Sequence, residues 1–123
     1  MIQVFPASSR LKLAVPGRDS WDIVSSRTDA HQATLRYVEI PPAWAAAARQ
    51  PHRHLGVEEV MWVLAGEGII EGPDIHLPVS EGCAVYVPAD VPHMTRNTGQ
   101  STLRLLCFFP ESSIGSHTEE PAR

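Results

Sequence analysis

Basic clusters and long apolar runs are both missing from this sequence of 123 residues. Ten Lys and Arg residues are outnumbered by fourteen Asp and Glu residues, the formal net charge is -4, and no basic block occurs. Recognition of nucleic-acid phosphates needs such a basic surface, so we expect no nucleic-acid partner. No window approaches the roughly 18 consecutive apolar residues of a membrane span, so we expect no membrane partner.

The N-terminus also lacks a secretory signal, because residues 1–6 contain no basic segment followed by a long apolar run. We therefore expect a cytoplasmic protein. Cysteine is scarce as well: Cys83 and Cys107 are the two present, and each lies in an apolar, strand-like run. Buried free thiols are the expected state in the reducing cytoplasm, and a disulfide is the alternative.

Proline and glycine, by contrast, are plentiful and spread along the chain, with 11 and 8 copies. This punctuation favours many short strands joined by turns, and no segment predicts a convincing helix. The fold class is therefore all-β, in a single domain, as either a sandwich or a closed barrel. The alanine-rich segment 43–50 is interpreted as a loop, either a connector or a flap over a pocket. Strands are expected over residues 2–5, 11–15, 21–24, 33–40, 60–64, 69–71, 75–77, 83–87 and 102–109, with one more after His93.

One stretch carries potential ligands for a metal. His52 and His54 lie two residues apart, so a strand would place both imidazoles on one face. Glu59 follows His54 at an odd spacing, which requires a bend that Gly56 is suited to supply. Surface histidines at a loop–strand junction are the alternative interpretation.

The order of these residues resembles the cupin family over roughly residues 33–109. The first cupin motif, G-x5-H-x-H-x3-4-E-x6-G, is matched by His52, His54, Glu59 and Gly66, and the second, G-x5-P-x-G-x2-H-x3-N, by Gly82, Pro88, His93 and Asn97. Two glycines of the pattern are replaced, by Ala46 and by Asp90. Aspartate tolerates left-handed backbone angles better than most residues do, so the second change is mild.

The resemblance implies a single-domain jelly-roll β-barrel that pairs as a homodimer and holds one metal ion through His52, His54, Glu59 and His93. Glu58 also satisfies the spacing from the histidines, but Glu59 stands six residues before Gly66, as the motif requires. Residues 1–32 lie before the resemblance and are expected to be strands packing on the barrel or at a dimer interface. Residues 33–109 would form the barrel core, and residues 110–123 a flexible C-terminal tail.

Three imidazoles and one carboxylate suit a divalent transition metal: Fe, Mn, Ni, Co, Cu or Zn. Open positions on such an ion are typical of catalytic sites, so the leading hypothesis is a metalloenzyme acting on a small organic molecule. Dioxygenase-type chemistry is slightly preferred to isomerase or lyase chemistry, and a non-catalytic binding module for a sugar or small carboxylate is the alternative. Arg36 and Tyr86 are weak catalytic candidates. The expected pocket-lining residues are Met61, Val63, Thr95 and Cys107.

Overall fold

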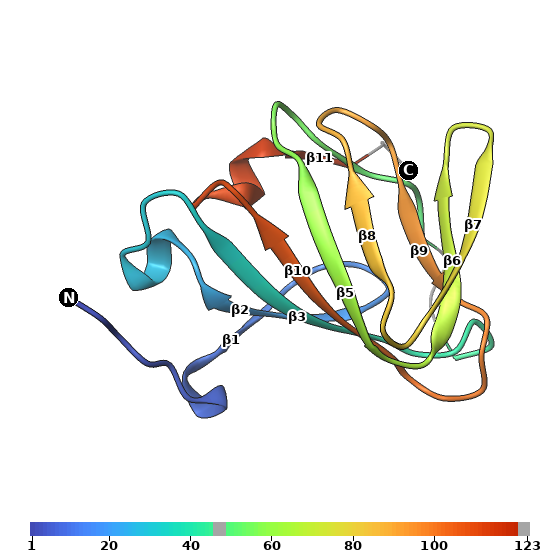
Figure 1. Cartoon of the computed structure of the whole chain (residues 1–123), viewed down its shortest axis with the longest axis horizontal. Helices are drawn as coiled ribbons and strands as arrows, with labels where there is room; N and C mark the ends of the chain where they lie inside the picture. Colours follow the sequence, from blue (N-terminus) through green and yellow to red (C-terminus); the bar gives the residue numbers. More distant parts are fainter. Residues whose placement is uncertain (46–48, 121–123) are drawn as a thin grey trace.

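The computed structural model describes residues 1–45 and 49–120, and this part of the chain contains strands and short 3-10 helices but no α-helix (Figure 1). The all-β class expected from the sequence is therefore confirmed. The 3-10 helices are η1 (Ala7–Ser9), η2 (Ser26–Thr28) and η3 (Ile114–His117). The strands are β1 (Leu11–Leu13), β2 (Asp19–Val24), β3 (Thr34–Ile40), β4 (Arg53–His54), β5 (Glu59–Ala65), β6 (Glu67–Gly72), β7 (Ile75–Ser80), β8 (Ala84–Val87), β9 (Met94–Asn97), β10 (Leu103–Phe109) and β11 (Thr118–Glu119).

Two main sheets enclose the core. The larger has the strand order β1-β2-β3-β10-β5-β8, and the smaller has the order β7-β6-β9, on the right of Figure 1. The chain crosses from β5 in one sheet to β6 in the other at Gly66, whose φ of +92° suits glycine. The short pair β11-β4 lies at one end, where paired backbone hydrogen bonds join His52 to His93 (N···O 3.0 and 2.8 Å). These bonds bring the two motifs of the sequence side by side.

The inward faces of the strands follow the alternation expected of a half-buried sheet. On β5 and β10 every second side chain is buried, and the ones between them face outward. A sheet with one face covered and one face outward gives this period of two. The buried members of these two central strands are Glu59, Met61, Val63, Leu103, Leu105, Cys107 and Phe109.

Two strand predictions differ from the structure. Residues 2–5 form no strand, because no neighbouring strand pairs with them and Ile2 stays 95% exposed. The strand predicted to end at Leu77 continues through Pro78 to Ser80. Proline is tolerated here because β7 is an edge strand, where its missing N–H costs no ladder bond.

The C-terminal segment was expected to be a flexible tail, but its described part, residues 110–120, is packed against the barrel. Ile114 in η3 is only 2% exposed, and β11 pairs with β4, where Arg53 and Glu119 form an ion pair of 2.8 Å. The apolar anchor and the added strand explain why this polar segment is held. Of the loop expected over 43–50, residues 46–48 lie outside the described part. Within the described part, no helix has the length and apolar character needed to cross a bilayer.

Candidate metal centre

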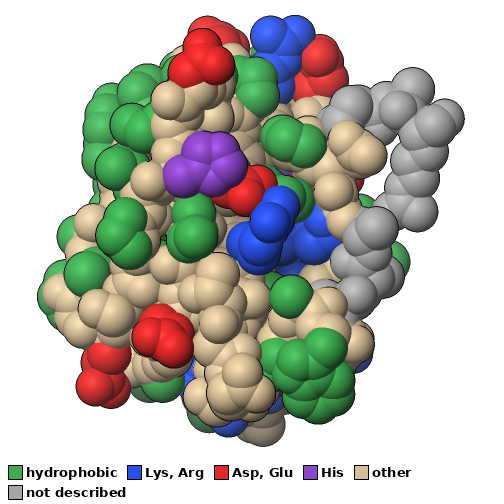
Figure 2. Space-filling model, turned by 90° about the vertical axis from the view of Figure 1, so that its right-hand side faces the viewer, with side chains coloured by type: hydrophobic (Ala, Val, Ile, Leu, Met, Phe, Trp, Pro, Cys, Tyr) green, Lys and Arg blue, Asp and Glu red, His purple; other side chains and the backbone are tan. Residues whose placement is uncertain are grey.

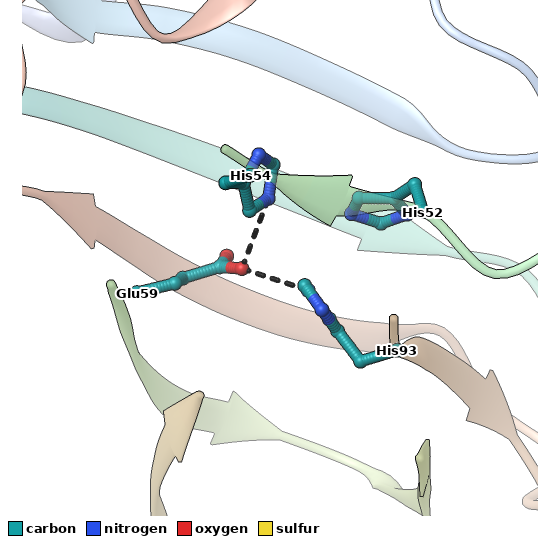
Figure 3. Close-up of side chains that lie close together, drawn as sticks. All are labelled: His52, His54, Glu59 and His93. Atoms are coloured by element: carbon teal, nitrogen blue, oxygen red, sulfur yellow. Dashed lines mark hydrogen bonds and ion pairs between the residues drawn. The ribbon is translucent and has the colours of Figure 1, made fainter. Parts of the chain in front are cut away.

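The four predicted ligands converge in the barrel interior (Figure 3). His54 belongs to β4, Glu59 begins β5, and His52 and His93 directly precede β4 and β9. One potential ligand atom from each residue lies within 4.8 Å of the others, and all four side chains are buried. Glu58 points outward and is exposed, so the structure supports the choice of Glu59 over Glu58.

The turns that present these ligands are tied to each other. Gly56 adopts φ +70° and makes the bend that the odd spacing between His54 and Glu59 requires. Its N–H donates to the Asp90 carboxylate (2.9 Å), and Asp90 itself adopts φ +69°. Aspartate therefore takes the left-handed turn conformation in place of the motif's glycine, as the sequence predicted.

Hydrogen bonds on the outer side of two imidazoles determine which nitrogen faces inward. Nδ1 of His93 lies 3.0 Å from the carbonyl oxygen of Val91, which can only accept, so Nδ1 carries the proton. The Thr118 hydroxyl donates to the carbonyl of Ile114 (2.9 Å) and must therefore accept from Nδ1 of His54 (3.0 Å). Both Nε2 atoms are thus left with lone pairs directed at the site.

This donor set fits a cation. Nε2 of His93 and Nε2 of His54 lie 3.0 and 3.3 Å from the same Glu59 oxygen, Oε1, so lone pairs and a carboxylate face one another. They repel unless a positive charge lies between them. Ligands at right angles around one ion, at about 2.1 Å each, stand about 3 Å apart, which matches both distances. Nδ1 of His52 is buried without a hydrogen-bond partner among the described residues.

The protonation states of His52 and Glu59 favour metal binding at neutral pH, whereas the pKa shift of His93 opposes it. Burial, followed by the neighbouring His93, lowers the pKa of His52 to about 3, so its imidazole is neutral. Burial raises the pKa of Glu59, but the adjacent His54 and His93 rings outweigh it and lower this pKa to about 2, so Glu59 is a carboxylate at neutral pH. Burial likewise lowers the pKa of His93, and contact with Glu59 outweighs it, so the net shift is upward. A neutral imidazole and a carboxylate are the forms that bind metals.

A cavity of about 280 Å³ opens beside the cluster. One part of its wall is apolar, and another carries charge, including residues from the β1–β2 turn and from the position just after β11. Basic side chains gather near the centre of the face shown in Figure 2, beside an acidic one. The apolar wall is made of Val15, Val38, Ile40, Met61, Leu105 and Phe109, and the charged residues outside the cluster are Arg18, Arg36, Arg49 and Glu120.

The other predicted site residues divide into two groups. Arg36, Met61, Thr95 and Cys107 line the cavity. Val63 points inward but is fully buried in the core and does not line it. Tyr86 must be corrected: it is 60% exposed on the outer face of β8 and donates to Glu58 (2.7 Å), so it cannot reach the site.

Sequence reasoning missed several cavity residues. Arg49 stands three residues before His52, a proximity that could have singled it out. Arg18, Thr118 and Glu120 come from segments far from both motifs, and only the packing of the β1–β2 turn and of β11 brings them to the cavity. No local pattern marks these three.

Two facing β-sheets that enclose three histidines and one glutamate define a cupin barrel with a candidate metal centre. The chain belongs to the Cupin_2 family, whose model, described as a cupin domain, matches residues 36–109. The expected single-domain jelly-roll fold is confirmed by solved structures of the same shape.

Among these structures is a variant of Bacillus subtilis oxalate decarboxylase, with a TM-score of 0.81 and 18% identity, covering 98% of this chain and 33% of that one. The Lactobacillus farciminis oxalate decarboxylase–formate complex has a TM-score of 0.77 and 18% identity, covering 92% and 34%. This chain therefore spans about a third of their length. An uncharacterised protein of Methanocaldococcus jannaschii is 32% identical over 56 residues, 46% of this chain and 45% of that protein.

Proposed function

We propose that this protein is a metal-dependent enzyme that converts a small organic molecule in the barrel cavity. The observation that carries the proposal is the Glu59 oxygen facing two imidazole Nε2 atoms, at 3.0 and 3.3 Å, beside a cavity of about 280 Å³. A divalent transition ion held by His52, His54, Glu59 and His93 would supply open coordination positions and Lewis acidity there. Solved structures support this proposal, since one concerns the Mn(II) centres of Bacillus subtilis oxalate decarboxylase. The metal, among Fe, Mn, Ni, Co, Cu and Zn, stays a prediction, as does the cytoplasmic location.

The cavity's remaining groups favour oxidative chemistry over proton transfer. Among the described lining residues, Glu120 is the one carboxylate outside the cluster, and it lies 3.6 Å from Arg18 in an ion pair. Burial, followed by the nearby Glu59, raises the pKa of Cys107, so its thiol stays protonated and is a poor nucleophile. An isomerase or lyase needs a positioned base, so we prefer dioxygenase-type chemistry.

The alternative is a binding module that captures a small carboxylate or a sugar without converting it. The same pairing of Glu120 with Arg18 favours this alternative, because it leaves no evident proton shuttle in the described cavity wall. Arg36 and Arg49 would then serve only to hold and orient the ligand.

Elemental analysis of protein purified without added metal tests the first step. We expect about one transition metal ion per chain, and strongly reduced content in His52→Ala and His93→Ala variants because each loses a ligand. His76→Ala is the matched control, since His76 is exposed on β7 and outside the cavity. Equal metal content in wild type and both ligand variants would refute the site. Turnover that requires dioxygen would then favour the dioxygenase-type enzyme over an isomerase or lyase. Tight ligand binding without any product would favour the non-catalytic binding module.

We also infer that the chain forms a homodimer through the outer face of its larger sheet. The strand register aligns outward side chains in two rows across β3, β10, β5 and β8. Apolar patches of this extent are rare on monomers, and two copies related by a two-fold axis can pack such faces together. The outer patch consists of Leu35, Phe108, Val60 and Tyr86 in one row and Tyr37, Leu106, Trp62 and Ala84 in the other.

A further inference from the structure

Three arginines line the cavity that adjoins the metal cluster. Arg18 comes from the turn between β1 and β2, Arg36 from β3 and Arg49 from the segment before β4. The acidic residues of the wall are Glu59, which belongs to the cluster, and Glu120, which pairs with Arg18. Arg36 and Arg49 therefore remain as positive charges that no described carboxylate of the wall neutralises directly.

Arg36 is an arginine in the interior of a barrel. On β3 it shares the inward face with Val38 and Ile40, and its register partner on β10 is the buried Cys107. Its Nε–H is buried and has no hydrogen-bond partner among the described residues. Its other register partner, Asp22, uses Oδ2 to bind Arg27 (3.3 Å) and the Ser25 hydroxyl (2.5 Å), while its Oδ1 is buried and makes no hydrogen bond among the described residues. Burial lowers the pKa of Arg36 and the charge of Asp22 opposes that shift, yet no described group accepts a hydrogen bond from its Nε–H.

Arg49 is held in place by features outside the metal motifs. Its Nη1 donates to the carbonyl of Thr95 (3.0 Å), while its Nε–H is buried without a partner. Gly17, at φ +71°, lies directly against the side chain: a Cβ there would stand 2.1 Å from Cγ of Arg49. Burial lowers the pKa of Arg49 to about 10, which leaves it charged at neutral pH. The turn at Gly17 therefore leaves room for a cationic side chain.

Buried donors without acceptors are costly, and more so when they carry charge. A guanidinium presents its N–H groups as a planar fork that matches the two oxygens of a carboxylate. The same cavity that the arginines line also has an apolar wall, which includes Val38, Ile40 and Leu105. An anion with an apolar body can accept hydrogen bonds from the arginines and pack on the apolar wall. A neutral, hydroxyl-rich sugar neither neutralises the positive charge nor matches the apolar wall.

We propose that the cavity binds a small organic carboxylate, whose carboxylate accepts hydrogen bonds from Arg36 and Arg49 and whose apolar body packs on Val38, Ile40 and Leu105. This proposal rests on the proposed function in naming the ligand of the same cavity, but carboxylate binding by the arginines does not require the metal. Phosphate offers arginine the same oxygen chemistry, so inorganic phosphate is the comparison ligand.

Calorimetric titration of chelator-treated, metal-free protein with pentanoate tests the proposal, with pentanamide as the neutral ligand of the same shape. We expect pentanoate to bind, pentanamide to bind at least tenfold more weakly, and phosphate to bind more weakly than pentanoate. Arg36→Gln and Arg49→Gln should each raise the Kd for pentanoate at least tenfold. Arg96→Gln is the matched control, because Arg96 is exposed and pairs with Glu71 (2.9 Å) outside the cavity.

Three results would overturn the proposal: equal affinity for pentanoate and pentanamide, unchanged affinity in both folded arginine variants, or arginine-dependent binding of phosphate without pentanoate. The acid–amide comparison uses wild type, so it decides the matter even where a variant fails to fold. Metal content, measured separately, keeps the two proposals apart. If the protein as purified holds no metal but binds pentanoate through the arginines, this inference is supported and the metal-dependent enzyme is rejected. If the purified protein holds its metal but does not bind pentanoate, this inference is rejected and the metal site stands.

Discussion

Thr118 decides which nitrogen of His54 is free to bind a metal. Its single hydroxyl hydrogen is donated to Ile114, so the oxygen can only accept from Nδ1 of His54. The N–H therefore stays on the outer side of the ring. Such outer partners fix ring orientation and raise the basicity of the ligand nitrogen. Thr118 lies outside residues 36–109, the part of the chain that the family model matches.

Replacing Thr118 with valine keeps the shape of the side chain and removes this acceptor. We expect the Thr118→Val variant to bind metal about 10- to 100-fold more weakly, because His54 loses its fixed tautomer. Competition titration against a chelating indicator measures the affinity, and nitrogen NMR of the His54 ring reports the tautomer directly. Thr118→Ser retains the hydroxyl and should behave as wild type. An unchanged tautomer and affinity in Thr118→Val would contradict this role.

Site residues could be predicted from the sequence where they lie in the two motifs, and not where they come from distant segments of the chain. His52, His54, Glu59 and His93 were predicted because their spacing resembles the two cupin motifs, while strand alternation and one bend account only for the first three. Tyr86 was placed wrongly, since a strand pattern alone does not say which face is inward. Arg18 and Thr118 could not be predicted, because only tertiary packing brings them to the cavity.

At the scale of elements, the segment after β10 closes one end of the barrel. Ile114 anchors η3 in the core, and β11 then adds its two residues to β4. The ion pair of Glu119 with Arg53 and the hydrogen bonds of Thr118 also hold β11, but Ile114 is the buried apolar side chain of this segment, so we attribute the position of β11 largely to it. The segment contributes Gly115, Thr118 and Glu120 to the cavity wall.

Truncating that anchor should destabilise the protein. We expect Ile114→Ala to lower the free energy of unfolding by about 2 to 5 kcal/mol, because it leaves a cavity in the core. Urea unfolding followed by tryptophan fluorescence measures the change. Ile75→Ala, the same substitution at an exposed position of β7, should cost about 0.5 kcal/mol or less. Similar losses in both variants would show that Ile114 is not an anchor.

Long alternating elements were the ones that the sequence predicted well. β3, β5 and β10 carry seven residues each with a clear inward and outward face, and their positions matched expectation within about two residues. β11 was missed because two residues show no periodicity. β7 was cut short at Pro78, since the sequence does not reveal that this strand stands at an edge.

The whole molecule presents one broad apolar surface, the outer patch across β3, β10, β5 and β8. Four of its eight side chains are aromatic, and Trp62 near its middle is 48% exposed. Trp62, Tyr86 and Phe108 are 48, 60 and 41% exposed, so each still offers about half of the roughly 150 to 250 Å² that an aromatic side chain can bury. The patch would therefore supply the apolar centre of a standard interface of approximately 800 Å² per partner.

Light scattering coupled to size exclusion should therefore give a mass of about twice the 13.5 kDa of one chain. Trp62→Glu places a charge within the outer patch, and we expect it to shift the mass to that of a single chain. Leu77→Glu serves as the control, because Leu77 is equally exposed on β7 but outside the patch. A monomeric wild type, or a dimer that survives Trp62→Glu, would reject this interface.

The pairing of β11 with β4 has a consequence for biosynthesis. Chains are made from the N-terminus, so all four candidate ligands leave the ribosome before Thr118 does. A metal ion captured at that moment would meet a His54 whose outer nitrogen is unrestrained and a barrel still open at one end. Release of the ion would then compete with arrival of the last segment. The order of synthesis thus makes the folding of residues 114–119 the step that would complete the candidate centre and determine how firmly a bound ion is held.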